Sequence, residues 1–260
     1  MFLFFFLDDI INLSEVVIFM LNTSIKNDRI KELVKLKDKK YRDNNDLFFI
    51  EGEDIVLEAY KRSLIKELYV LEGTVVDMDI PVTYVSYDVM KKISDMESIS
   101  EYYAVCYKKK EESIGNKIIM LDGVQDPGNL GTIIRSAVAF NFDTVVISKN
   151  TVDLYNPKVI RSTKGMLFNV NIIVKDLVEF INNELDGYEV IGTDVVNGNN
   201  IRDIDVPSKM ALVIGNEGRG MSTEVKELCN KFIYIDMNNK CESLNASVAA
   251  SILMYEVNNK

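Results

Sequence analysis

The residues best suited to chemistry lie in a glycine-rich stretch, LVIGNEGRGM, at positions 212–221. An apolar run ends there at Gly215, and three glycines then alternate with Asn216, Glu217 and Arg219. Glycine lets a backbone approach a ligand closely and adopt a positive φ. A plain strand-to-helix turn explains one glycine, but not three with two charged residues among them. The stretch therefore predicts a ligand-binding loop at the carboxyl end of a strand, where open α/β sheets bind their ligands.

A second stretch, LDGVQDPGNLGTIIRSAVAF at positions 121–140, has a similar strand-to-helix pattern. Pro127 and Gly128 turn the chain, and Asn129 is a good residue to cap the helix that follows. Arg135 lies about one and a half turns into that helix, between apolar neighbours. An arginine in this position suits an ion pair or a ligand contact at least as well as it suits a plain surface location. Arg135 is therefore a candidate site residue.

The third stretch, IDMNNKCESLNASVAASILMYE at positions 235–256, is a polar loop followed by an apolar helix of small residues. Ser243 is expected to cap this helix, with Asn245 in its first turn. An ordinary capped helix explains Ser243, but it does not explain a third asparagine-containing loop beside two like it. A helix rich in small residues is also expected to pack closely against another surface.

The composition excludes several kinds of site. The 260 residues include no histidine, which removes the commonest general base and the commonest metal ligand, so no metal site is expected. The three cysteines are widely spaced and predict neither a zinc site nor a disulfide framework, so a reduced, cytoplasmic setting is the simplest. The net charge of −10 argues against a protein that coats nucleic acid, but it is compatible with a local basic patch.

The order of the apolar runs predicts two α/β domains. Residues 1–20 are apolar but interrupted by acidic residues and lack signal-peptide features, so we expect an extension before a native start at Met20. Residues 21–107 contain short alternating elements typical of a small domain, and residues 108–116 form a polar linker. In residues 117–260, strands and helices alternate regularly, which predicts a mostly parallel sheet covered by helices on both faces.

The expected elements follow from the periodicity of the apolar residues. Strands are predicted at residues 47–50, 65–71, 82–85, 102–107, 117–121, 144–148, 170–174, 188–193, 210–214 and 232–235. Helices are predicted at residues 51–62, 88–96, 129–140, 156–164, 176–184, 222–230 and 243–257, with a further helical pattern across residues 22–43.

Taken together, the three stretches resemble the motifs of the SPOUT superfamily, and most closely its SpoU/TrmH class of RNA 2′-O-ribose methyltransferases. The residues that carry the resemblance are Asn129, Gly131, Arg135 and Phe140 in the first motif, 212–222 in the second, and Glu242, Ser243, Leu244 and Asn245 in the third. One motif alone would be weak evidence, but three in this order with matching sheet context are specific. The resemblance covers residues 117–260, and residues 24–105 more loosely resemble the substrate-binding domain that precedes it in many members.

The resemblance implies an α/β protein with a parallel-sheet catalytic domain that ends in a trefoil knot, preceded by a small α/β domain that binds RNA. It also implies S-adenosylmethionine as the cofactor and a homodimer with the site near the subunit interface. Arg135, often acting from the partner subunit, would be the catalytic arginine, with Asn129, Glu217 and Asn245 around it. The residues expected to hold the cofactor are Thr193, Gly215, Asn216, Gly218, Ile235, Met237, Ser243 and Leu244.

A ribose hydroxyl is a weak acid, so such a site must align it with the methyl group and accept its proton. Without histidine, the candidate acceptors are Glu217, Arg135, Asp126 and Asp122. A guanidinium is a poor base, so Arg135 is better suited to bind the adjacent phosphate, where it would lower the pKa of the hydroxyl or pass the proton to that phosphate. Glu217 is expected to pair with Arg135 or with substrate hydroxyls.

RNA binding by an acidic chain requires local positive charge. One candidate is the face formed by Lys158, Arg161 and Lys164, and the other is the lysine-rich segment 26–42. The two-domain layout favours ribosomal RNA, with transfer RNA methylation and a non-catalytic RNA-binding relative as alternatives. A Rossmann-type nucleotide-binding enzyme is disfavoured, because GVQDPG follows the first strand of the larger domain in place of Gly-x-Gly-x-x-Gly.

Overall fold

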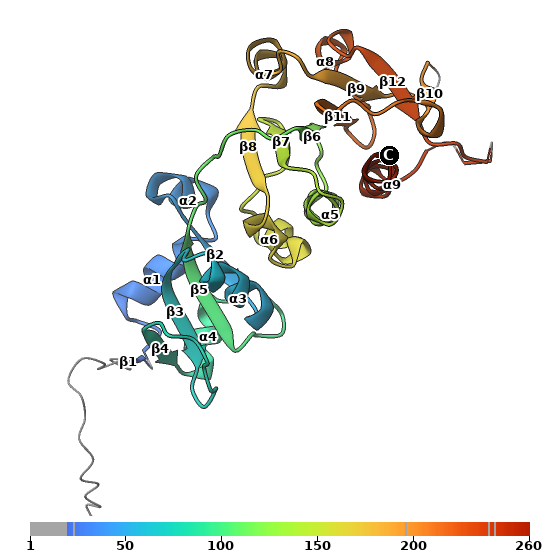
Figure 1. The fold of residues 1–260 in the computed structure, drawn as a ribbon. Coiled ribbons are helices and arrows are strands. Elements are labelled where there is room, and N and C mark those ends of the chain that lie inside the picture. The colour runs from blue at the N-terminus through green and yellow to red at the C-terminus, as the bar shows by residue number, and fades with distance from the viewer. Residues whose placement is uncertain (1–19, 23, 196, 239, 242) are drawn as a thin grey trace, which may run out of the picture.

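The computed structural model describes residues 20–22, 24–195, 197–238, 240–241 and 243–260. The predicted extension up to residue 19 and Glu242 of the third motif lie outside the described residues. The described chain forms two α/β units, each built on its own sheet and joined by a segment at residues 108–116 that has no regular structure (Figure 1).

The first unit is a five-stranded mixed sheet in the order β1-β4-β3-β5-β2. Its strands are β1 (Met20–Asn22), β2 (Leu47–Glu51), β3 (Ile65–Leu71), β4 (Val82–Val85) and β5 (Tyr102–Tyr107). Its helices are α1 (Asp28–Lys35), α2 (Lys39–Asn45), α3 (Glu53–Lys61) and α4 (Tyr87–Ile93). Both faces of the sheet are covered, since Phe48 and Phe49 on β2 point to opposite sides and each enters a separate buried cluster.

The second unit is a seven-stranded parallel sheet in the order β10-β12-β9-β11-β6-β7-β8. Its strands are β6 (Lys117–Asp122), β7 (Thr144–Ser148), β8 (Asn171–Lys175), β9 (Glu189–Thr193), β10 (Asn199–Asn200), β11 (Met210–Gly215) and β12 (Lys231–Tyr234). Its helices are α5 (Pro127–Ala139), α6 (Pro157–Thr163), α7 (Leu177–Glu184), α8 (Thr223–Glu227) and α9 (Ala246–Asn258), with 3₁₀ turns at Met166–Phe168 and Ile201–Asp203.

The helices of the second unit form a layer on each face of its sheet (Figure 1). Ile119 and Leu121 on β6 pack on the side of α5 and α9, whereas Ile118 and Met120 pack on the side of α7 and α8. This alternation explains why β6 is apolar at nearly every position, because both faces of a parallel sheet are buried. No helix among the described residues is both long and apolar enough to cross a membrane.

The predicted strands agree with the structure to within one residue at each end, and the structure adds the short strands β1 and β10. Met20, grouped with the extension in the sequence analysis, pairs with Thr83 of β4. The helical pattern across residues 22–43 is two helices, α1 and α2. The helix predicted at residues 88–96 ends at Ile93, because the Ser94 hydroxyl and the Asp95 amide donate hydrogen bonds to Glu51.

A buried ion pair joins the two units, beside an apolar contact in which Phe48 of β2 packs against Tyr155 and Phe168. Arg42, at the end of α2, donates from Nη2 to Asp153 Oδ2 at 2.5 Å, and from Nη1 to the carbonyl oxygens of Leu36 and Lys37. The Arg42 side chain is only 4% exposed and that of Asp153 18%. A buried guanidinium that loses its carboxylate is left uncompensated, so this pair constrains how the first unit sits on the second.

We predict that Asp153→Asn, which keeps the size of the side chain and removes its charge, lowers the free energy of unfolding by about 3 kcal/mol. Urea denaturation at neutral pH measures this change. The matched control is Asp28→Asn, which removes an exposed ion pair to Lys31 and should change the midpoint much less than Asp153→Asn does. Equal midpoints for Asp153→Asn and the wild type would contradict the role assigned to the pair.

Candidate functional site

The three polar stretches meet at the carboxyl edge of the second sheet. Asp122, at the end of β6, accepts hydrogen bonds from the backbone N and the hydroxyl of Ser222, both at 2.7 Å. Asn216, just after β11, donates from Nδ2 to the carbonyl oxygen of Gly123 at 2.7 Å. Because β6 and β11 are neighbours, these contacts tie the loops that follow them into one wall.

A row of hydrogen-bonded side chains links all three stretches. Asn245 donates from Nδ2 to Asn129 Oδ1 at 2.9 Å, and Asn129 donates from Nδ2 to Glu217 Oε1, also at 2.9 Å. Asn129 is 7% exposed, so both of its amide groups are satisfied within the protein. The carboxylate, which can only accept, fixes which end of the Asn129 amide faces Asn245.

The carboxylate of Glu217 is surrounded by N–H donors. Its second oxygen accepts from the backbone N of Gln125 at 3.2 Å, and Oε1 also accepts from the backbone N of Asp126 at 3.3 Å. Burial raises the pKa of Glu217, but the hydrogen bonds from Asn129 and from these backbone groups outweigh it, so the pKa is lowered. Glu217 is therefore an ionised acceptor at neutral pH and a weak base.

The helix caps differ from those expected. Asp126, not Asn129, caps α5 by accepting from the backbone N of Asn129 at 2.8 Å. Asn245, not Ser243, caps α9, and its Oδ1 accepts from the backbone N of Ser247 at 2.9 Å. Capping occupies the oxygen of Asn245 and leaves its amide nitrogen free to reach Asn129. In α9, the capping residue Asn245 thus also belongs to the hydrogen-bonded row. In α5, the capping residue Asp126 supports the row, because it binds the backbone of Asn129.

The glycines of the second stretch have different roles. A side chain on Gly215 would collide with Gly220 and Met221, with a Cβ only 2.3 Å from their backbone, because the loop folds back on itself there. Gly218 has room for a Cβ, whose nearest neighbour would be Asn216 Oδ1 at 3.8 Å. Asn216 Oδ1 also accepts from the backbone N of Gly218 and Arg219 and so shapes the loop. The close approach of the backbone to itself within the loop thus explains why position 215 is a glycine.

A cavity of about 450 Å³ opens beside this row. It lies between the loops that follow β9, β11 and β12 and the start of α9. All eight residues predicted to bind the cofactor line it: Thr193, Gly215, Asn216, Gly218, Ile235, Met237, Ser243 and Leu244. Its volume falls in the range of about 300–1,000 Å³ typical of small-molecule sites, and apolar and polar lining groups both suit a nucleoside-containing ligand.

The predicted catalytic residues are only partly brought together. Asn129, Glu217 and Asn245 are in direct contact. Arg135 is exposed on α5, does not line the cavity, and makes no hydrogen bond or ion pair with another described residue. The expected pairing of Glu217 with Arg135 is therefore absent within one chain, because N–H groups of the first stretch occupy the carboxylate instead.

The basic face on α6 is also less free than expected. Lys158 and Lys164 are exposed, but Arg161 is half-buried, and its guanidinium lies 3.6 Å from Asp95 of the first unit. Helix α5 reaches α6 closely because Gly131 has no side chain, and a Cβ there would lie 2.3 Å from that of Ser162. Arg161 thus contributes to the contact between the units.

Some residues of the site were missed by sequence reasoning. Asp194, Val195 and Tyr234 line the cavity, and Gln125 joins the row through its backbone N. Asp122, proposed as a proton acceptor, instead binds Ser222. The available signal for Asp194 was its position directly after a predicted strand, at the edge of the sheet where ligands bind.

Comparisons with known proteins find relatives of both units. Residues 116–255 match the SpoU rRNA Methylase family and residues 27–104 the MRM3-like substrate binding domain. The chain is 34% identical over 241 residues to the 23S rRNA (guanosine(2553)-2'-O)-methyltransferase RlmP of Bacillus subtilis (strain 168), covering 90% of this chain and 97% of that protein.

Two solved structures are similar along nearly the whole chain. The AdoMet-bound rRNA methyltransferase from Sinorhizobium meliloti has a TM-score of 0.82 and 26% identity, covering 93% of this chain and 98% of that one. A crystal structure of an RNA 2'-O ribose methyltransferase has a TM-score of 0.78 and 27% identity, covering 92% and 98%.

Glu217→Gln should destabilise the protein in a pH-dependent way. A carboxylate with a lowered pKa contributes stability above its ordinary pKa of about 4.3, and this contribution is lost as the pH falls through the lowered value. We expect urea unfolding to show the variant less stable than the wild type at pH 7, with a difference that shrinks at lower pH.

The control for this experiment is Glu227→Gln on α8, an exposed carboxylate that makes no hydrogen bond or ion pair with another described residue. It should match the wild type at both pH values. A difference for Glu217→Gln that stays constant or grows on acidification would show that the hydrogen bonds do not favour the ionised carboxylate.

Proposed function

The chain belongs to the SpoU rRNA Methylase family, and from that premise we propose that it transfers a methyl group from S-adenosylmethionine to a ribose 2′-hydroxyl of ribosomal RNA. It is an RNA 2′-O-ribose methyltransferase. The observation that carries the proposal is the row Asn245–Asn129–Glu217, which joins three loops from distant parts of the sequence beside one cavity. Ribosomal RNA is preferred to transfer RNA because the B. subtilis relative, matched along nearly its full length, carries a 23S rRNA name.

The cavity residues would hold the cofactor. Ile235, Leu244 and Leu253 offer apolar contacts for a base, while backbone groups around Gly215 and Met237 offer hydrogen bonds. When bound, S-adenosylmethionine supplies an activated methyl group with a neutral leaving group. The chain's own task is therefore to place and activate the hydroxyl.

The row is suited to placing the ribose rather than to removing its proton. Glu217 has a lowered pKa and several N–H donors, so it is a poor base. Asp122 is occupied by Ser222. We assign Asn129, Glu217 and Asn245 to orient the substrate, and Arg135 to bind the adjacent phosphate and favour the developing oxyanion electrostatically.

We propose that this arginine reaches the site across a homodimer. Arg135 is exposed on α5 and has no hydrogen-bonding or ion-pair partner among the described residues, which supports a role outside its own chain. The adjoining helix α9 exposes 46% of Val248 and 53% of Tyr255, large apolar groups that a second subunit would cover.

We also propose that the C-terminal segment is knotted and that the domains divide at residues 21–107, 108–116 and 117–260. The chain passes from β12, on the far side of β9, to α9, which packs against α5. On the way, Ile235, Met237, Ser243 and Leu244 line the same cavity as the loop after β11. This crossing supports threading of one segment past the other.

Lys158 and Lys164 remain candidates for RNA contact. We propose a cytoplasmic location for the enzyme.

The experiment that tests the function is methyl transfer from labelled S-adenosylmethionine to unmodified 23S rRNA transcribed in vitro. We expect the label on a ribose 2′-oxygen, detected as a dinucleotide that resists alkaline hydrolysis. Calorimetry should show that the protein binds S-adenosylmethionine. Absence of cofactor binding, or label on a base, would contradict the proposal.

Arg135→Ala should lower the turnover about 100-fold without changing the affinity for S-adenosylmethionine. The control Arg202→Ala removes another exposed arginine and should retain activity. If the arginine acts across the dimer, mixing Arg135→Ala with Glu217→Ala restores about a quarter of wild-type activity, since half of the dimers then contain one complete site. A mixture as inactive as its components would show that each site uses its own arginine.

A further inference from the structure

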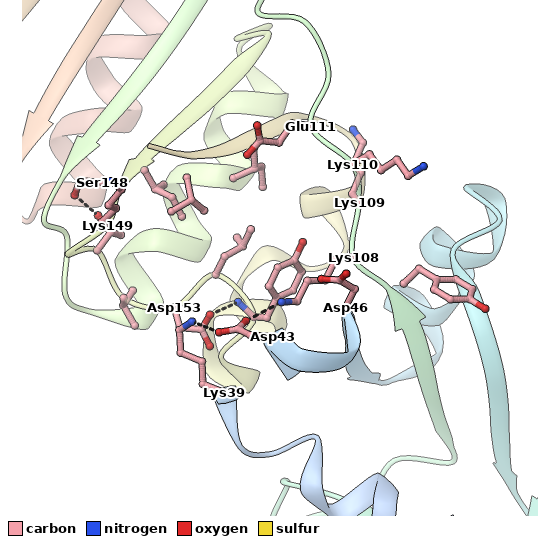
Figure 2. Close-up of a pocket in the computed structure, with 18 residues that line it drawn as sticks. Lys39, Asp43, Asp46, Lys108, Lys109, Lys110, Glu111, Ser148, Lys149 and Asp153 are labelled. Atoms are coloured by element: carbon pink, nitrogen blue, oxygen red, sulfur yellow. Dashed lines mark hydrogen bonds and ion pairs between the residues drawn. The ribbon is translucent and has the colours of Figure 1, made fainter. Parts of the chain in front are cut away.

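A second and larger cavity, a cleft of about 700 Å³, lies between the two units. Its walls come from α2, from the linker at residues 108–111, and from the segment that follows β7 (Figure 2). Five of its lining residues are lysines, an unusual concentration in a chain of net charge −10. They are Lys39, Lys108, Lys109, Lys110 and Lys149.

Three of these lysines are already paired. Lys39 and Lys108 both bind the carboxylate of Asp43, at 2.5 and 2.7 Å. Lys109 binds Glu112 at 3.0 Å and the carbonyl oxygen of Val170. Most acidic residues of the lining are paired as well. Asp153 pairs with Arg42, and Glu111 lies 3.7 Å from Lys175. Among the described lining residues, this leaves Asp46 as the carboxylate without an ion pair.

Lys110 and Lys149 are the exception. Both are exposed, and neither makes a hydrogen bond or ion pair with another described residue. Lys110 belongs to the linker and Lys149 to the loop after β7, so they stand on opposite sides of the cleft (Figure 2). Two unpaired lysines on opposite sides of one cleft favour an anionic ligand that extends across it.

The cleft also offers aromatic surface. Tyr107, which lines it, has a side chain that is 49% exposed, whereas the ring of Tyr155 is half-buried between Phe48 and the Lys108 ammonium. Positive charge along a groove together with aromatic rings is the combination by which proteins bind single-stranded nucleic acid, since the charge attracts phosphates and the rings stack on bases.

The cleft is joined to the proposed methyl-transfer site by two hydrogen bonds. Asn150, next to Lys149, accepts at its carbonyl oxygen from Gln125 Nε2 at 2.5 Å. The backbone N of Gln125 in turn donates to Glu217. Lys149 and Glu217 thus belong to adjoining loops on the same carboxyl edge of the sheet.

We propose that this cleft binds the sugar–phosphate backbone of a single-stranded segment of the RNA substrate, with Lys110 and Lys149 contacting phosphates on its two walls. The inference rests on the proposed function and adds a binding subsite to it. A strand is favoured over a small free anion because the charges lie on both walls, an exposed aromatic ring lies beside them, and the loop that carries Lys149 adjoins the loops of the site.

The test measures how the affinity for a mixed-sequence single-stranded oligoribonucleotide depends on salt, for the wild type, Lys110→Ala, Lys149→Ala and the double variant. Each lost phosphate contact should reduce the slope of log K against log salt by about 0.7, and the double variant by about 1.4. The control Lys209→Ala removes an exposed lysine just before β11, at the opposite edge of the sheet, and should leave the slope unchanged.

In methyl transfer to 23S rRNA, the double variant should raise the KM for RNA, with the kcat and the affinity for S-adenosylmethionine unchanged. Slopes equal to that of the wild type, or an equal loss in Lys209→Ala, would overturn the subsite. Inorganic phosphate that protects the cleft lysines from chemical modification as well as the oligoribonucleotide does would also overturn the subsite, because it would identify a site for a small anion.

The two proposals fail separately. If the wild type transfers no methyl group but the slopes change as expected, the proposed reaction is wrong and the cleft is still a nucleic-acid subsite. If methyl transfer occurs and the slopes do not change, the reaction stands and the subsite is wrong.

Discussion

The hydrogen-bonded row from Asn245 through Asn129 to Glu217 is the interaction on which the site depends. At one end, Asn245 caps α9 and so is aligned by that helix. At the other end, Glu217 is held ionised by N–H donors of the loop before α5. Each amide can therefore adopt one orientation, and three loops from different parts of the chain become a single wall beside the cavity.

The fold provides the conditions for this row. The parallel pairing of β6 with both β7 and β11 places the carboxyl ends of these strands at one edge, where loops and cleft adjoin. The buried pair between Arg42 and Asp153 then fixes the smaller unit against that edge. Substrate binding by the smaller unit and chemistry at the larger one are thus linked through a shared apolar cluster and a few charged contacts rather than through a continuous sheet.

Much of this was predictable from sequence, because parallel strands buried on both faces give unbroken apolar runs with sharp ends, as at residues 144–148. The loops that carry function were predictable from their glycines and polar residues. The helix caps were not, since Asp126 and Asn129 are both good caps and only tertiary contact decides between them. The partners of Glu217 and the cleft could not be predicted, because they join separate segments of the chain, such as Gln125 and Glu217, which are 92 positions apart.

We propose that Asn129 and Asn245 act as one unit in cofactor and substrate binding. The direct test is a double-mutant cycle of Asn129→Ala and Asn245→Ala that measures the kcat/KM for methyl transfer. The loss of the α9 cap occurs in both branches of the cycle and therefore cancels. We expect a coupling energy of at least about 1 kcal/mol. Strictly additive effects of the two substitutions would contradict it.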